Sequence, residues 1–216
     1  MSKRRVFVVA GGDVDNSDFS LLHRERDWII AADGGAVKCW QAGIVPHLAV
    51  GDFDTAGESF VAELARQGIL IKRLPAAKAE TDTQYAVREA IKKKPDEIII
   101  LGALGGSRFD HTLANVGLLE WMEQQGVRGC LYHRCNRIRL VTGPAEVLFV
   151  KENFSFVSLI PVTECVEGIT TRGFLYPLNK ESLYRGLTRG ISNELSEEKA
   201  TLTFERGKCL LVESRD

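Results

Sequence analysis

Long hydrophobic runs, paired cysteines and an excess of either charge are all missing from this chain of 216 residues. No segment approaches the ~20 consecutive apolar residues that a membrane-spanning helix needs. The 28 Lys and Arg residues nearly balance the 29 Asp and Glu residues, so the formal net charge is −1. Such a chain has no general attraction to a nucleic-acid backbone or an anionic membrane. We therefore expect neither of these as a partner.

The cysteines and the first apolar run indicate a cytoplasmic protein. The five cysteines are scattered without a C-x-x-C pair, which argues against zinc sites and a disulfide framework and favours reduced thiols. Lys3-Arg4-Arg5 precedes only the short apolar run from Val6 to Ala10, whereas a signal peptide needs an apolar region of about 7–15 residues. We interpret this run as a first β-strand.

In the first two-thirds of the sequence, short apolar runs alternate with segments of helical periodicity. Continuous apolar strands such as Ile98-Ile99-Ile100-Leu101 are typical of a parallel sheet that is covered on both faces. The pattern predicts an α/β domain, a Rossmann-like αβα arrangement with a mostly parallel sheet. The predicted strands are 5–10, 28–32, 47–50, 69–74, 97–101 and 129–133, and the predicted helices are 35–42, 58–67, 83–93 and 111–125.

The pattern changes near Gly143-Pro144. From Ala145 onward, β-branched and aromatic residues recur between turn signals, and long helical periodicity is absent. This is typical of a small all-β sandwich or barrel. The predicted strands are 147–150, 154–160, 168–171, 200–204 and 209–212. We place the domain boundary between residues 143 and 144, which predicts domains spanning 1–143 and 144–216.

Acidic side chains lie where the predicted strands of the first domain end. The positions are Asp33, Asp52 with Asp54, Asp82 and Asp110, each in a short loop marked by Gly or Thr or flanked by Arg and His. Carboxylates gathered at the carboxyl ends of parallel strands are hard oxygen ligands, suited to Mg²⁺ that carries a polyphosphate. The sequence therefore predicts magnesium-dependent phosphoryl or pyrophosphoryl transfer.

The Gly51-Asp52-Phe53-Asp54 loop leaves two chemical interpretations open, beside that of a merely solvated loop. Both carboxylates can approach one cation if the backbone turns at Gly51; in an extended strand they point to opposite faces. Alternatively, Asp52 is the covalent nucleophile of a phosphohydrolase, because the strand-D-x-D-T order loosely resembles the haloacid dehalogenase loop. The Thr55-Ala56-Gly57 continuation departs from the D-G-T order of that family, and the loop does not follow the first strand.

Two further loops carry groups that are suited to phosphate. The glycine-rich turn 102–107 lies between a strand and a helix, so its N–H groups can bind phosphate. Arg108 can bind a phosphate through two N–H groups, and Asp110 can position Arg108 or a metal-bound water. Lys78 is another cation for phosphate. It precedes Thr81-Asp82, where either side chain can instead cap the next helix.

The second half contains two segments that are suited to a flat heterocyclic ligand. Tyr176 stands beside Pro177, which offers a rigid stacking face, and Ser192-Asn193 can supply donors and acceptors for the edge of a ring. Ordinary turns around a core tyrosine are the alternative interpretation.

Taken in order, these motifs resemble the thiamine pyrophosphokinase family, and above all its bacterial form, over nearly the whole chain. The matching segments are 32–36, 51–55, 81–82, 105–111, 113–115, 136–138, 173–178 and 190–194. The resemblance implies the reaction ATP + thiamine → AMP + thiamine diphosphate, with Mg²⁺. It also implies an N-terminal nucleotide domain and a C-terminal thiamine-binding β-sandwich. The family assembles as a homodimer, with sites between the nucleotide domain of one subunit and the thiamine domain of the other.

By matching position, the resemblance assigns a role to each candidate residue. The expected metal ligands are Asp52, Asp54 and Asp82, which together with Arg108 and Asp110 form the expected catalytic set. The expected nucleotide-binding residues are Asp33, Gly34, Lys78, Thr81, Gly105, Gly106, Arg108 and Asn136, and the expected thiamine-binding residues are Tyr176, Leu178, Ser192 and Asn193. Two positions depart from the usual family pattern: Ala79 follows Lys78 where Asp is common, and Ser107 separates Gly106 from Arg108.

Two rival functions make different predictions. A phosphohydrolase that uses Asp52 covalently releases phosphate without thiamine. A non-catalytic sensor of thiamine or nucleotide binds its ligand without forming AMP, and the full set of carboxylates argues against it. Formation of AMP that requires thiamine and is abolished by EDTA separates all three functions.

Overall fold

The computed structural model describes residues 4–54 and 56–216, so Lys3 and Thr55 of the motifs above lie outside the described residues. Contacts divide the chain into two units, Met1–Arg134 and Cys135–Asp216. This division lies upstream of the boundary that we expected between residues 143 and 144. The reason is strand β7 (Asn136–Thr142), which the sequence pattern did not reveal and which pairs with β13 (Lys208–Ser214).

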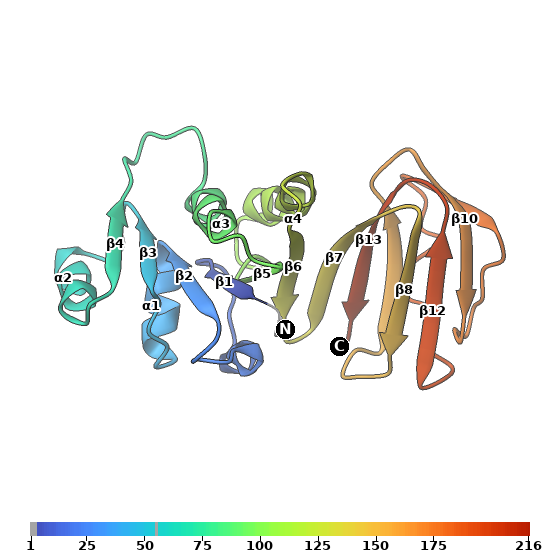
Figure 1. Ribbon diagram of the computed structural model, residues 1–216, viewed down its shortest axis with the longest axis horizontal. Helices are drawn as coiled ribbons and strands as arrows, with labels where there is room; N and C mark the ends of the chain where they lie inside the picture. The colour runs from blue at the N-terminus through green and yellow to red at the C-terminus, as the bar shows by residue number, and fades with distance from the viewer. Residues whose placement is uncertain (1–3, 55) are drawn as a thin grey trace. The chain divides into compact units, whose positions relative to one another are not determined.

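The first unit contains parallel strands in the order β4-β3-β2-β1-β5-β6 (Figure 1). The strands are β1 Arg5–Val9, β2 Trp28–Ala32, β3 Leu48–Gly51, β4 Leu70–Arg73, β5 Glu97–Leu101 and β6 Arg128–His133. The helices are η1 Asn16–Leu21, α1 Gly34–Gln41, α2 Glu58–Arg66, α3 Asp82–Ile91 and α4 Phe109–Gln124. The predicted strands and helices of this unit are all present, with ends shifted by no more than two residues; the short 3-10 helix η1 was not predicted.

Both faces of this sheet are covered, as the apolar strands predict. Along β1, Phe7 and Val9 belong to one core cluster, and the intervening Val6 and Val8 are buried as well. Successive side chains of a strand point to opposite faces, so both faces lie in apolar surroundings. Helix α1 packs on β1 and β2, and α3 packs on β1, β2, β3 and β5. The expected α/β class with a mostly parallel sheet is confirmed.

Glycines bring the loops at the carboxyl ends of the strands close together. A Cβ atom on Gly35, in the first turn of α1, would lie 1.9 Å from the carbonyl oxygen of Val9. A Cβ atom on Gly12 would lie 2.4 Å from the carbonyl oxygen of Gly102, to which the Gly12 N–H donates a hydrogen bond of 3.1 Å. The start of α1 and the loop after β1 can therefore pack directly on neighbouring backbone.

The second unit is built from antiparallel strands. One sheet has the order β7-β13-β9 and the other has the order β11-β10-β12-β8. The remaining strands are β8 Ala145–Val150, β9 Phe156–Pro161, β10 Cys165–Arg172, β11 Glu181–Tyr184 and β12 Lys199–Phe204. Side chains from both sheets, such as Leu159, Leu202 and Leu211, share one hydrophobic core. The antiparallel β class of this unit is confirmed, although β11 was not predicted.

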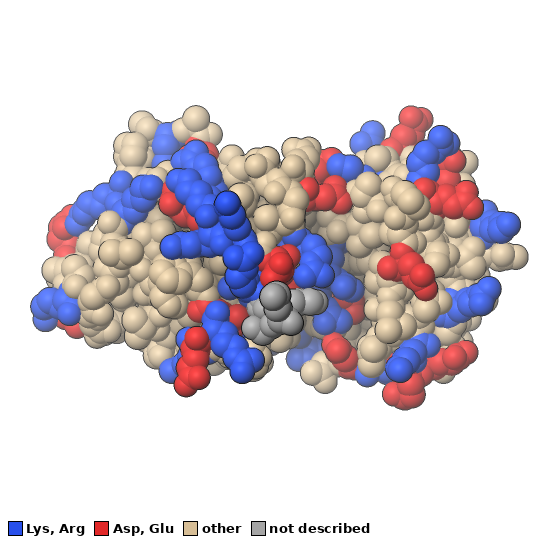
Figure 2. All heavy atoms as spheres, viewed as in Figure 1, with Lys and Arg blue, Asp and Glu red and all other residues tan. Residues whose placement is uncertain are grey.

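Acidic and basic side chains are interspersed on the face shown in Figure 2, and basic ones gather over α3 and β4. Much of this charge on α3 and β4 is paired locally. The Glu89 carboxylate lies 3.1 Å from the Lys72 ammonium and 2.7 Å from that of Lys92, and Arg88 pairs with Glu80 at 2.6 Å. Within the described residues, no helix is both long and apolar enough to cross a membrane.

The contact beneath Gly35 predicts a difference between two helical glycines. Gly35→Ala should lower the free energy of unfolding by about 1–3 kcal/mol or more, because a methyl group has no room beside the Val9 carbonyl. Gly117 of α4 faces open space, so Gly117→Ala should leave stability unchanged or raise it by up to about 1 kcal/mol through helix propensity. Urea unfolding of both variants measures the difference, and equal effects would contradict the close-packing argument.

Candidate active site

A cavity of about 930 Å³ opens at the carboxyl ends of the strands in the first unit. Its walls are the loops after β1, β2, β4 and β5 and the first turns of α1, α3 and α4. Strand β1 lies between β2 and β5. Strands β2, β3 and β4 follow one another on one side of β1, and the chain then crosses to β5 on the other side. Ligands of open α/β sheets bind in the crevice that such a reversal creates.

Asp33 lies at the start of α1 with a positive φ of 45°. Its N–H donates to the Val50 carbonyl at 2.7 Å, which ties the ends of β2 and β3 together. Its Oδ1 atom is buried and has no hydrogen-bond partner among the described residues. Burial raises the pKa of the Asp33 carboxyl, and the charges of Asp82 and Asp52 raise it further. The Asp33 carboxylate therefore lies among other acidic groups, and one of its oxygens has no hydrogen-bond donor among the described residues.

Lys78 is the cation that partly balances these carboxylates. Its Nζ lies 3.1 Å from Asp82 Oδ1 and 3.5 Å from Asp52 Oδ2, and all three side chains are largely buried. Burial alone lowers the pKa of Lys78, but the hydrogen bond and charge of Asp82, followed by those of Asp52, raise it overall. The Lys78 ammonium thus occupies a position between two carboxylates that attract cations.

The residues fit Mg²⁺, although they do not form a complete cage. Among the described residues, no group of three His, Cys, Asp or Glu side chains is arranged to hold a metal. Mg²⁺ commonly uses one or two carboxylates and takes its other ligands from water and substrate phosphates. Asp52 and Asp82 provide two such carboxylates, and the partnerless oxygen of Asp33 is a further hard donor.

Asp52 and Asp54 both lie outside the cavity lining. Asp54 is exposed, and its N–H donates to Asp52 Oδ1 at 3.3 Å. Thr81 is the residue that caps α3, because its Oγ1 accepts a hydrogen bond from the Gln84 N–H at 3.1 Å. Asp82 follows as the first residue of the helix and lines the cavity. Glu80, which follows the unusual Ala79, also lines the cavity and pairs with Arg88.

The glycine-rich loop after β5 presents its backbone to the cavity. Gly105 and Gly106 line it with φ values of 76° and 85°, a conformation that favours glycine. The buried Asn115 of α4 donates to the Ala103 carbonyl at 3.0 Å and holds the loop. Arg108 lines the cavity, and its guanidinium lies 2.6 Å from the Asp110 carboxylate.

The Arg108–Asp110 pair is exposed, and Asp110 lies outside the cavity lining. The hydrogen bond from Arg108 is the main cause that holds the pKa of Asp110 below its usual value. Asp110 therefore remains an acceptor that orients the Arg108 guanidinium, which can turn its other N–H groups toward an anion.

Several residues of the cavity were not singled out from the sequence. Gly11, Gly12 and Asp13 follow β1, and their loop could have been found by the same strand-end argument that identified Asp33. Lys38 lies four residues after Gly34 on α1, and this spacing puts both residues on one face of the helix. The other lining residues outside the predicted motifs are Ala10, Ala76, Glu80, Thr83 and Thr112, whereas Ala32, Gly102, Ala103, Ser107, His111 and Asn115 lie within them.

A second cavity, of about 320 Å³, lies in the second unit and includes all four expected thiamine-binding residues, Tyr176, Leu178, Ser192 and Asn193. Both polar atoms of the Asn193 side chain bind the backbone of Tyr176: Oδ1 accepts from its N–H at 3.0 Å, and Nδ2 donates to its carbonyl at 2.8 Å. Asn193 thus orients the segment that carries the Tyr176 ring. Asn136, the remaining nucleotide candidate, begins β7 in this unit.

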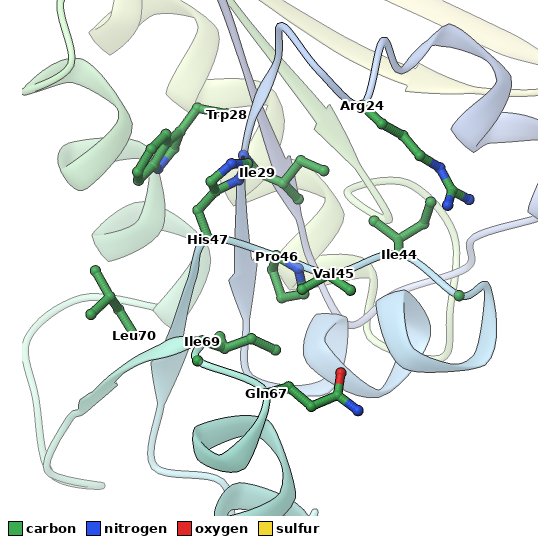
Figure 3. Close-up of a pocket in the computed structure, with 12 residues that line it drawn as sticks. Arg24, Trp28, Ile29, Ile44, Val45, Pro46, His47, Gln67, Ile69 and Leu70 are labelled. Atoms are coloured by element: carbon green, nitrogen blue, oxygen red, sulfur yellow. Dashed lines mark hydrogen bonds between the residues drawn. The ribbon is translucent and has the colours of Figure 1, made fainter.

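A third cavity, of about 510 Å³, lies at the amino ends of β2, β3 and β4 and contains none of the predicted site residues (Figure 3). Its walls are mainly apolar, with Ile44, Val45 and Ile69 among them. His47 Nδ1 accepts a hydrogen bond from the Ile29 N–H at 3.1 Å, and burial followed by the charge of Lys93 lowers the pKa of His47. We assign this histidine a structural role.

The chain is similar to thiamin pyrophosphokinases over both units. The family model described as "Thiamin pyrophosphokinase, catalytic domain" matches residues 19–131, and "Thiamin pyrophosphokinase, vitamin B1 binding domain" matches residues 146–209. The sequence is 34% identical over 215 residues to thiamine pyrophosphokinase of Bacillus subtilis (strain 168). The alignment covers 99% of this chain and 100% of that relative.

Solved structures show the same likeness. The crystal structure of the Bacillus subtilis thiamine pyrophosphokinase has a TM-score of 0.89 and 32% identity, with 98% of this chain and 99% of that one covered. The thiamin pyrophosphokinase of Geobacillus thermodenitrificans has a TM-score of 0.86 and 29% identity, with 98% of each chain covered.

The raised pKa of Asp33 predicts that its negative charge destabilises the fold. An acid whose pKa is higher in the folded state binds more protons there, so stability falls as the pH rises from the unfolded value through the folded value. Asp33→Asn should therefore raise the urea midpoint at pH 7 without divalent cations, and the gain should vanish below about pH 4.

Asp54→Asn is the matched control, because this carboxylate is exposed. Its stability should change by no more than about 0.5 kcal/mol. An Asp33→Asn protein that is less stable than the wild type at pH 7 would show that the Asp33 charge does not oppose folding.

Proposed function

This chain belongs to the thiamin pyrophosphokinase family, and we propose how its residues divide the work of the reaction. The enzyme transfers the pyrophosphoryl group of ATP to thiamine and gives thiamine diphosphate. The family membership does not favour a phosphohydrolase that uses Asp52 covalently or a non-catalytic sensor. We propose that the first unit binds the nucleotide in a Rossmann-like manner, across the carboxyl ends of its strands, and that the second unit binds thiamine.

We propose that Asp52 and Asp82 hold Mg²⁺, with Asp54 as the third acidic residue of the site. The supporting observation is the buried Lys78 ammonium between the Asp52 and Asp82 carboxylates, beside the partnerless oxygen of Asp33. When bound, Mg²⁺ neutralises negative charge on the phosphates. Lys78 supplies further positive charge for phosphate oxygens, and Asp33 helps to order the nucleotide.

The glycine-rich loop and Arg108 are proposed to fix the polyphosphate. Gly105 and Gly106 expose backbone N–H groups at the start of α4, where the helix dipole favours an anion. Asp110 orients Arg108. Asp82 is our choice for the group that accepts the proton of the thiamine hydroxyl as its oxygen attacks the β-phosphorus and AMP leaves. Such a reaction depends mainly on positioning and charge neutralisation.

The cavity of the second unit is proposed to bind the rings of thiamine. Tyr176 offers an exposed aromatic face, which suits the positively charged thiazolium ring of thiamine. Asn193 holds the Tyr176 backbone through two hydrogen bonds. Leu178 contributes an apolar wall, and the Ser192 hydroxyl is available to a polar edge of the ligand. We thus assign recognition to Tyr176 and Ser192 and orientation to Asn193.

We also propose a cytoplasmic homodimer whose active sites combine the nucleotide unit of one subunit with the thiamine unit of the other. Apolar side chains are exposed on each unit: Phe109 and Leu113 on α4 are 69% and 57% exposed, and Leu175 and Ile191 near the smaller cavity are 50% and 45% exposed. Exposed apolar groups of this kind often mark an interaction surface, and a second copy of the chain is the partner that we propose.

The reaction is tested with purified protein, ATP, Mg²⁺ and thiamine. AMP should form only when thiamine is present, and EDTA should abolish its formation. Asp52→Asn should lower kcat/KM by about 100-fold or more, because it removes negative charge from the proposed cation site. It should also remove the rise in Tm that Mg²⁺ gives the wild-type protein. Glu63→Gln, which changes a partly buried acid on α2 that lies outside the cavity, is the control.

Phosphate release without thiamine would support the hydrolase instead. Near-normal turnover and Mg²⁺ response of Asp52→Asn would exclude Asp52 as a metal ligand.

Mixing two inactive variants tests the shared site. Asp82→Ala should inactivate the proposed nucleotide site of the first unit, and Asn193→Ala should disrupt the proposed thiamine site of the second unit. If each site takes one unit from each subunit, an unfolded and refolded equal mixture should regain about a quarter of wild-type activity, because half the dimers are mixed and each has one intact site. A site contained within one subunit gives no recovery. Sedimentation of both variants confirms whether dimers form.

A further inference from the structure

The loop after β1 carries a carboxylate that the proposed reaction does not use. Asp13 lines the large cavity beside Gly11 and Gly12, at the reversal point between β1 and β5. The Gly12 N–H binds the Gly102 carbonyl, and a Cβ atom on Gly105 would lie 3.3 Å from the Asp13 Cβ. Asp13 is therefore packed against the glycine-rich loop to which we assign the phosphates.

His133 lies beside Asp13 at the end of β6. The Nε2 atom of His133 lies 3.6 Å from Asp13 Oδ2, which is longer than a hydrogen bond, and the histidine side chain is only 13% exposed whereas that of Asp13 is 58% exposed. Burial raises the pKa of the fully buried Asp18, and the charge of His133 is among the influences that lower it. Asp13 thus has an imidazole beside it and remains more than half exposed.

The surroundings of Asp13 differ from those of Asp82 and Glu80, two other carboxylates in the lining. Asp82 pairs with Lys78, and Glu80 pairs with Arg88. Among the described residues, no Lys or Arg pairs with Asp13. A carboxylate in this position repels a bare phosphate, and an ionised carboxylate can only accept hydrogen bonds. A neutral part of the nucleotide that donates hydrogen bonds therefore suits Asp13 better than a bare phosphate does.

We propose that Asp13 accepts hydrogen bonds from the ribose hydroxyls of ATP and makes the enzyme selective for ribonucleotides, with His133 as its positioning residue. The inference deepens the proposed function of the same cavity. Ribose is joined directly to the phosphates, so it comes next to the glycine-rich loop, where Asp13 lies.

The test compares ATP with 2′-deoxy-ATP and 3′-deoxy-ATP as substrates, and AMP with its two deoxy forms as ligands in calorimetry. The wild-type protein should favour the ribose form by about tenfold or more over at least one deoxy form, as expected for a hydrogen bond to a charged group. Asp13→Ala should weaken binding of the ribose form and bring this ratio close to one. His133→Leu should reduce the ratio in part, and His133→Gln, which keeps an N–H donor, should restore it.

Asp15→Ala is the matched control, because Asp15 is an acid of the same segment that pairs with Arg134 and does not line the cavity. It should keep the wild-type ratio. Equal weakening of ribose and deoxyribose forms by Asp13→Ala, or an unchanged ratio, overturns the proposal. Loss of selectivity between ATP and ITP instead would place Asp13 at the base and likewise overturn it. The calorimetry with AMP is independent of thiamine, so failure of the proposed reaction is recognised separately.

Discussion

Burial of both faces of the parallel sheet is the constraint on which the rest of the first unit depends. Side chains such as Val8 and Phe7 are buried on opposite faces of β1. Polar and charged groups that can meet a ligand are therefore found in the loops at the strand ends. Gly12 and Gly35 allow these loops to approach neighbouring backbone. The same packing that stabilises the domain therefore brings polar groups from distant parts of the sequence to one edge.

Several carboxylates lie close together at that edge. One ammonium, that of Lys78, pairs with both Asp52 and Asp82, while burial and the charges of these two acids raise the pKa of Asp33. The raised pKa of Asp33 means that its charge opposes folding in the free protein. The metal–nucleotide site that we propose accounts for these carboxylates better than a purely structural ion pair does, because a structural pair needs no further acid beside it.

The two units differ in the groups that line their cavities. The first cavity is lined by charged side chains and by a glycine-rich backbone. In the second, the Asn193 side chain binds the backbone of Tyr176. The cost of ordering the aromatic segment is then met during folding, before a ligand binds, which is how preorganisation favours affinity.

The sequence alone determined the alternation of strands and helices, the antiparallel second unit and the acidic positions at strand ends, because apolar periodicity and loop composition are local properties. It did not reveal β7, which is defined by pairing with the distant strand β13. It also missed β11, a strand of four residues that pairs with the preceding strand β10. Tertiary structure also decided that Lys78 lies between Asp52 and Asp82, that Asn193 binds Tyr176, and that Asp13 meets His133. Lys78 and Asp82 are only four residues apart, but the contacts of Lys78 with Asp52 and of His133 with Asp13 join distant parts of the sequence, which no local pattern encodes.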